Sequence, residues 1–167
     1  YWSARISFLL GNAKEANSFL KKAATRERTF YGSLAMASLG YKYEPNFNLP
    51  EYDENLINKI TIHKGGVRAL ALIEVNEFHK AAREFRKIIP KFDIQDYPQL
   101  LSFTSKNNMP GLTFRLAAIL RNDHNKILLG GLYPIPSWEI NNIDLKDKAL
   151  LYAIARQESG FNPRAKS

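Results

Sequence analysis

Cysteine is absent from the 167 residues of this chain. Its absence excludes disulfide bonds and thiolate metal sites, although it does not assign a compartment. Long apolar runs are also missing, since no stretch approaches the roughly eighteen consecutive apolar residues of a membrane span. No signal peptide is present. The sequence begins at Tyr1 and stops inside a motif, so we expect a fragment cut at both ends. In a fragment, the lack of a membrane span and of a signal peptide says little about where the longer parent protein is located.

Sustained alternation of apolar and polar residues, which is typical of strands, is also lacking, and Ile60-Thr61-Ile62 is too short to indicate a strand. Helical spacing of apolar residues dominates instead. The fourth predicted helix is expected to end at Gly65-Gly66. The spacing predicts an all-α fold with helices over residues 3–10, 13–24, a segment starting near Phe30, about 53–63, 67–75, 77–89, 97–106, 112–121 and 145–159.

The sequence pattern of the first predicted helix recurs later in the chain. Aligning Trp2 with Tyr31, and Leu10-Gly11 with Leu39-Gly40, gives the same offset of 29 residues both times. A helix pair repeated at about thirty residues indicates an α-solenoid, in which each pair buries its apolar face by stacking on its neighbours.

Two stretches indicate domain edges. Residues 45–52 contain two prolines and few periodic positions, and the glycine pair 130–131 is followed by two further prolines. Proline and glycine clusters of this kind mark loops and boundaries. We therefore expect domains over 1–45, 46–130 and 131–167.

Basic residues exceed acidic ones, and the formal net charge is +8. Such a charge favours anionic partners, namely nucleic acid, acidic lipid headgroups or a cell-wall polymer that bears carboxylates. An ordinary solvated basic surface explains it equally well. Lys80, Arg83, Arg86 and Lys87 form one basic helix face, but no exposed aromatics are interleaved with them, so no nucleic-acid partner is expected.

Cofactor and metal motifs are not found. His63, His79 and His124 are isolated from one another and from carboxylates at ligand spacing, so no metal site is expected. The glycine pairs lack the lysine and hydroxyl residue of a P-loop and the spacing of a dinucleotide fingerprint. Residues 141–148 do not match a calcium loop. We expect no cofactor.

The last predicted helix carries a carboxylate on its apolar side. Leu151, Ile154, Ala155 and Glu158 fall at i, i+3, i+4 and i+7, which is one face of an α-helix. Asp144 is the expected N-cap, and Asp147 lies in the first turn, where a negative charge is favourable. Gly160 is expected to end the helix, and Pro163 follows where a helix cannot continue.

Glu158 is the candidate catalytic residue. Burial on the apolar stripe would disfavour its charged form, and the partial negative charge of a helix C-terminus would do the same. A carboxyl group that keeps its proton near neutral pH can act as a general acid. The alternative is an ordinary helix-end glutamate neutralised by Arg156 or Arg164.

The end of the chain resembles a known family. The string Glu158-Ser159-x-Phe161-x-Pro163-x-Ala165-x-Ser167 is similar to the motif around the catalytic glutamate of soluble lytic murein transglycosylases, the lysozyme-like enzymes of glycoside hydrolase family twenty-three. Tyr133-Pro134 and the run Leu151 to Gln157 resemble that family as well. So do the opening residues, Tyr1-Trp2-x-Ala4-Arg5 and Phe30-Tyr31-Gly32-x-Leu34-Ala35, which are similar to its superhelical domain.

The resemblance implies an architecture and an activity. Residues 1–45 would end a helical superhelix, 46–130 would form an all-α linker domain, and 131–167 would begin a lysozyme-like catalytic domain. The enzyme would cleave the β-1,4 bond between N-acetylmuramic acid and N-acetylglucosamine in peptidoglycan and form a 1,6-anhydro sugar. It would act on glycan strands in the periplasm, and proteins of cell-wall synthesis would be further partners.

The same resemblance implies roles for individual residues. Glu158 would be the single general acid and base, and Ser167 would lie in the saccharide cleft near the acetamido group. Ser159, Phe161 and Pro163 would hold the turn that follows the glutamate. Tyr133 and Trp138 have aromatic faces that could stack on a sugar ring, but packing between domains is the favoured interpretation.

One departure from the family concerns activity. The family continues after this serine with a glycine-rich segment and the rest of the lysozyme-like lobe, so we expect the isolated 167-residue chain to be inactive. The alternative function is a non-catalytic helical-repeat module that binds a protein or a cell-wall glycan.

Overall fold

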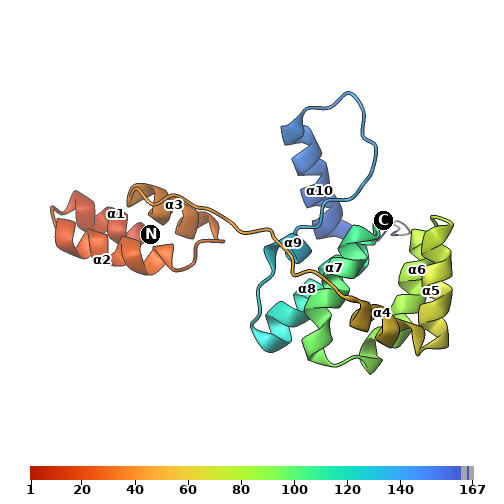
Figure 1. Cartoon of the computed structure of the whole chain (residues 1–167). Coiled ribbons are helices and arrows are strands. Elements are labelled where there is room, and N and C mark those ends of the chain that lie inside the picture. Colours follow the sequence, from red (N-terminus) through yellow and green to blue (C-terminus); the bar gives the residue numbers. More distant parts are fainter. Residues whose placement is uncertain (163–164, 166–167) are drawn as a thin grey trace. The chain divides into compact units, whose positions relative to one another are not determined.

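The computed structural model describes residues 1–162 and 165, and it is all-α, as the sequence predicts (Figure 1). The described residues form ten α-helices and two short 3-10 helices, with no strand. The chain divides into two compact units, Tyr1–Pro45 and Asn46–Ser167.

The first unit has three helices, α1 (Trp2–Leu9), α2 (Ala13–Ala24) and α3 (Phe30–Ser38). The helices pack on one another through small residues, since Ala4, Ala16 and Ala35 are buried. The repeat positions Trp2 and Tyr31 meet edge to face, with ring centroids 6.1 Å apart. Residues 41–53 contain no helix, so a superhelix beyond these three helices stays a prediction.

The second unit is built on one hydrophobic core, and the largest fully buried side chain of the described residues is Phe85. The longer helices that contribute to the core are α4 (Glu54–Thr61), α5 (Lys64–Glu74), α6 (Phe78–Ile88), α7 (Tyr97–Lys106) and α8 (Pro110–His124). The 3-10 helices Ile89–Lys91 and Ile94–Asp96 connect α6 to α7. Burial of this apolar surface is the main stabilising term for the unit.

Gly65-Gly66 does not end a helix, contrary to the expectation from the sequence. Both residues lie in the first turn of α5, which begins at Lys64. A Cβ on residue 66 would overlap the carbonyl group of Ile60 in α4. Gly66 therefore lets α4 and α5 approach closely, and Gly65 lies against Ile88 of α6, contacts between helices that turn rules do not detect.

Gly130-Gly131 has a similar use. The pair lies inside a short helix, α9 (Leu129–Leu132), which packs against α7 and α8. A Cβ on residue 131 would lie 2.8 Å from the Cβ of Ala117, and one on residue 130 would overlap the carbonyl oxygen of Phe47. The glycines thus fix α9 between the segment that opens this unit and α8.

We expect the Gly130→Ala variant to lose about 2–3 kcal/mol of unfolding free energy, because the added methyl group must displace the backbone at Phe47. Chemical denaturation followed by circular dichroism measures the loss. An unchanged denaturation midpoint would show that the segment near Phe47 yields without cost.

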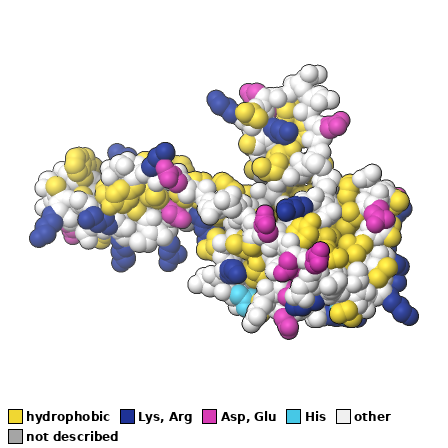
Figure 2. Space-filling model, viewed as in Figure 1, with side chains coloured by type: hydrophobic (Ala, Val, Ile, Leu, Met, Phe, Trp, Pro, Cys, Tyr) yellow, Lys and Arg dark blue, Asp and Glu magenta, His cyan; other side chains and the backbone are white. Residues whose placement is uncertain are grey.

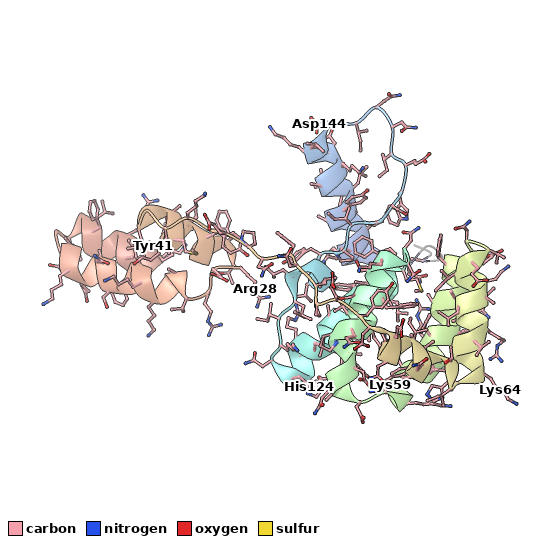
Figure 3. All side chains as sticks on the ribbon, viewed as in Figure 1. Arg28, Tyr41, Lys59, Lys64, His124 and Asp144 are labelled. Atoms are coloured by element: carbon pink, nitrogen blue, oxygen red, sulfur yellow. The ribbon has the colours of Figure 1, made fainter. Side chains whose placement is uncertain are left out.

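The last helix, α10 (Leu145–Ser159), has the bounds that the sequence predicts. Asp144 caps it, since its side chain accepts a 2.8 Å hydrogen bond from the backbone N–H of Asp147, and Figure 3 labels Asp144 at this end of the helix. Gly160 ends it in the left-handed conformation with a φ of 55°. None of the described helices is long and apolar enough to cross a membrane.

Candidate active site

Glu158 lies in the last turn of α10, and its side chain is exposed. This differs from the expectation that it belongs to a buried stripe. The stripe exists, but Leu151 and Ile154 are 45% and 48% exposed and α10 has no buried residue. Figure 2 shows hydrophobic side chains on the visible side of α10. The carboxylate therefore shares an open, partly apolar face of the helix.

No ion pair neutralises Glu158 among the described residues. Arg156, the first candidate partner, is engaged elsewhere: its Nε–H donates a 2.7 Å hydrogen bond to the carbonyl oxygen of Leu132. The second candidate, Arg164, lies outside the described residues. The described part of the chain thus leaves the carboxylate available to a ligand.

The guanidinium group of Arg156 also lies between two aromatic rings. Its Cζ atom is 4.9 Å from the ring centroid of Phe114 in α8 and 4.6 Å from that of Tyr133, which follows α9. Cations over aromatic faces at such distances are attracted by the ring quadrupole. Arg156 therefore attaches α10 to two neighbouring elements.

The turn after Glu158 is held by local hydrogen bonds. The Ser159 hydroxyl donates to the carbonyl oxygen of Ala155 at 2.9 Å and accepts from the backbone N–H of Asn162 at 3.2 Å. Phe161 follows with a φ of 61°, a conformation that side chains other than glycine seldom adopt. These contacts are of the kind expected of residues that support the turn.

Phe161 is the buried end of this turn and is only 4% exposed. Its ring lies 6.5 Å from Phe114 and 6.1 Å from Trp138, centroid to centroid. At the same turn the start of α8 comes close, since a Cβ on Gly111 would be 3.0 Å from the carbonyl oxygen of Gly160. The chain is therefore anchored to the second unit both before Glu158, at Arg156, and after it, at Phe161.

Tyr133 and Trp138 have packing contacts in this structure. Tyr133 contacts Phe47 edge to face at 6.5 Å in addition to Arg156, and Trp138 contacts Tyr152 at 5.9 Å in addition to Phe161. The Tyr152 hydroxyl donates to the carbonyl oxygen of Pro136 at 3.2 Å. Stacking of these rings on a sugar stays a prediction.

A groove of about 660 Å³ runs beside α10, on a different face from Glu158. From α10 it is lined by Leu145, Lys148, Ala149, Tyr152, Ala153 and Arg156, which recur with helical spacing, whereas Glu158 does not line it. Residues two positions apart on a helix point in nearly opposite directions. The candidate carboxylate therefore faces away from this groove.

Two residues of the predicted site, Pro163 and Ser167, lie outside the described residues. Within the described part of the chain, no group of three histidine, aspartate or glutamate side chains could hold a metal ion. Comparison with models of protein families finds no match, and no curated protein matches the chain either.

The sequence predicted Arg156 only as an ion-pair partner for Glu158. It did not predict the contacts of Arg156 with Leu132, Phe114 and Tyr133. One pattern could have indicated them. Ala149, Tyr152 and Arg156 recur at i, i+3 and i+7, which places the arginine on the face of the helix away from Glu158.

Proposed function

We propose that the chain carries the acid-bearing helix of a peptidoglycan lytic transglycosylase, with Glu158 as its single general acid and base. The observation that carries the proposal is the placement of Glu158. It occupies the last turn of α10, in the motif that resembles the family, exposed beside apolar side chains and anchored on both sides. A general acid must be accessible to the leaving oxygen, and an anchored helix places it there.

The proposed reaction uses one carboxyl group twice. Glu158 donates its proton to the glycosidic oxygen, and the bond between this oxygen and the anomeric carbon breaks. The acetamido group of the substrate stabilises the anomeric carbon. The carboxylate then takes the proton of the 6-hydroxyl group while that oxygen attacks the anomeric carbon, which closes the 1,6-anhydro ring. Typical glycosidases need a second carboxylate, whereas here the substrate provides the nucleophile.

The open face of α10 supports a further part of the proposal. Leu150 is 59% exposed and lies close to the partly exposed Leu151 and Ile154, an unusual density of apolar side chains for a solvated helix face. A saccharide cleft needs a second wall, and this face is suited to contact one. Covering the face would exclude water from the reaction. On this account the 167-residue chain has one wall of the cleft and is inactive alone.

The remaining assignments follow from the same proposal. Residues 1–45 would end a superhelix, 46–130 would form the linker domain, and 131–167 would begin the catalytic domain. The substrate would be glycan strands of peptidoglycan in the periplasm. The net charge of +8 is favourable for a polymer that carries carboxylates on its peptide stems.

A second candidate function is a non-catalytic helical-repeat module that binds a protein or a cell-wall glycan. One observation favours it: the first unit exposes several aromatic side chains together, with Trp2 57% and Phe30 71% exposed and both in contact with Tyr31. Exposed aromatic clusters of this kind mark binding surfaces.

Product analysis separates the two functions. The product of the complete gene and the 167-residue chain are each incubated with purified peptidoglycan, and the released muropeptides are identified by mass spectrometry. We expect 1,6-anhydro ends from the complete gene product and none from the 167-residue chain. Sedimentation of the complete gene product with peptidoglycan, without any released product, would support the binding module and contradict the enzyme.

A further inference from the structure

Arg156 connects α10 to two other helices of the second unit. It donates to the carbonyl oxygen of Leu132 in α9 and lies between the rings of Phe114 in α8 and Tyr133. We propose that this arrangement, the Arg156 clamp, makes Arg156 a positioning residue that sets the rotation of α10 about its axis and so the direction of Glu158. The proposal rests on the function proposed above.

Helix geometry links the two residues. Successive residues turn by about 100° around an α-helix, so Arg156 and Glu158 point about 160° apart. When the Arg156 side chain is fixed against α8 and α9, Glu158 must point away from them, toward the open face that carries Leu151 and Ile154. A rotation of one residue would move the carboxylate toward the edge of that face.

Hydrophobic burial does not set this rotation, because α10 has no buried residue. Phe161 fixes the chain beyond the end of the helix, where its backbone N–H also bonds the carbonyl oxygen of Ala155, so it holds the C-terminal end of α10 and not its middle. Tyr152 contributes one hydrogen bond, to Pro136, and one ring contact, to Trp138, and both partners lie in the irregular segment between α9 and α10. Arg156 contacts the regular helices α8 and α9 directly and is therefore the contact best placed to fix the orientation.

The chemistry of the clamp requires arginine. The planar guanidinium group can lie between two rings while its Nε–H donates in the plane, whereas lysine has neither the plane nor this donor. The carbonyl oxygen that accepts the bond belongs to Leu132, which is only 1% exposed, so the bond is shielded from water on the acceptor side. Arg156→Lys therefore keeps the positive charge but removes the planar group and the Nε–H donor.

The first test measures the clamp in the 167-residue chain by NMR. In the wild type we expect the Arg156 side-chain protons to be shifted upfield by the two rings and its Nε–H to exchange slowly. Arg156→Lys should raise amide exchange in α10 about tenfold or more, since the hydrogen bond to Leu132 is lost and the planar group that lies against the two rings is removed. Tyr133→Leu, which keeps the arginine and removes one ring, should have an intermediate effect. Arg5→Lys is the matched control, because Arg5 lies over the Trp2 ring in the first unit.

The second test measures catalysis by the product of the complete gene. We expect Arg156→Lys to lower kcat by about 10- to 100-fold, the range for a displaced catalytic group, with KM changed less than about twofold. The pH dependence of the remaining activity should keep its shape, because the acid itself is unchanged. Arg5→Lys should have wild-type kcat.

Each outcome decides the proposal. Wild-type amide exchange in α10 of Arg156→Lys overturns the clamp, whether or not activity falls, because a positioning residue must act through the helix. Raised exchange with wild-type kcat shows that the rotation of α10 does not matter for catalysis and overturns the positioning role. Failure of the proposed function is a separate result, since it would appear as an inactive wild type or a fully active Glu158→Gln variant.

Discussion

Replacing Glu158 by glutamine in the product of the complete gene should abolish the release of 1,6-anhydro muropeptides and leave the fold intact. Glutamine keeps the shape of the side chain but can neither donate the proton to the leaving oxygen nor accept one from the 6-hydroxyl group. Loss of a general acid usually costs about 10²-fold or more in rate. Because Glu158 is exposed and has no ion pair among the described residues, the substitution breaks no described contact that stabilises the fold.

Glu74→Gln is the matched control for this experiment. Glu74 is likewise an exposed glutamate in the last turn of a helix, α5, far along the chain from the candidate site. We expect its variant to have wild-type activity and the same melting temperature as Glu158→Gln. Retention of more than about a tenth of wild-type turnover by Glu158→Gln would be incompatible with a general acid.

The second large effect is expected from Phe161→Ala. The ring is buried against Phe114 and Trp138, and truncation of a buried phenylalanine costs about 3–5 kcal/mol. Alanine also fits poorly at a positive φ, which the large buried ring now stabilises. We expect the turn after Glu158 to detach, with a lower unfolding midpoint for the second unit and altered fluorescence of Trp138, which loses its contact with the ring.

Phe30→Ala provides the comparison for Phe161→Ala. Phe30 is 71% exposed, so its truncation leaves no cavity and should cost less than about 1 kcal/mol. Equal, small losses in both variants would show that Phe161 does not anchor the turn. In that case the fixed placement of Glu158 would rest on Arg156 alone.

Local rules predicted the helix that carries the candidate acid. Asp144 can cap a helix because its side chain is short and accepts a backbone hydrogen bond, and Gly160 can end one because glycine tolerates a positive φ. Both effects depend only on residues within one turn, so the sequence suffices to find them. The same holds for the all-α class, which follows from the spacing of apolar residues.

Features that depend on distant residues were not predicted. The two glycine pairs look like breaks in the sequence, but Gly65 lies against Ile88 of α6 and Gly130 against the backbone of Phe47. Periodicity likewise places Leu151, Ile154 and Glu158 on one face of a helix without indicating whether anything covers that face. The clamp around Arg156 needs two rings and a carbonyl group from 23 to 42 positions away in the sequence. Such contacts become visible only in three dimensions.

The fate of water oxygen tests the central claim most directly. Purified peptidoglycan is digested by the product of the complete gene in water enriched in oxygen-18, and the released muropeptides are analysed by mass spectrometry. If Glu158 acts as a single acid and base and the substrate supplies its own 6-hydroxyl group, the muramic acid ends must be 1,6-anhydro sugars without oxygen-18. Reducing ends that carry one oxygen-18 atom would show hydrolysis by an activated water and would contradict this account.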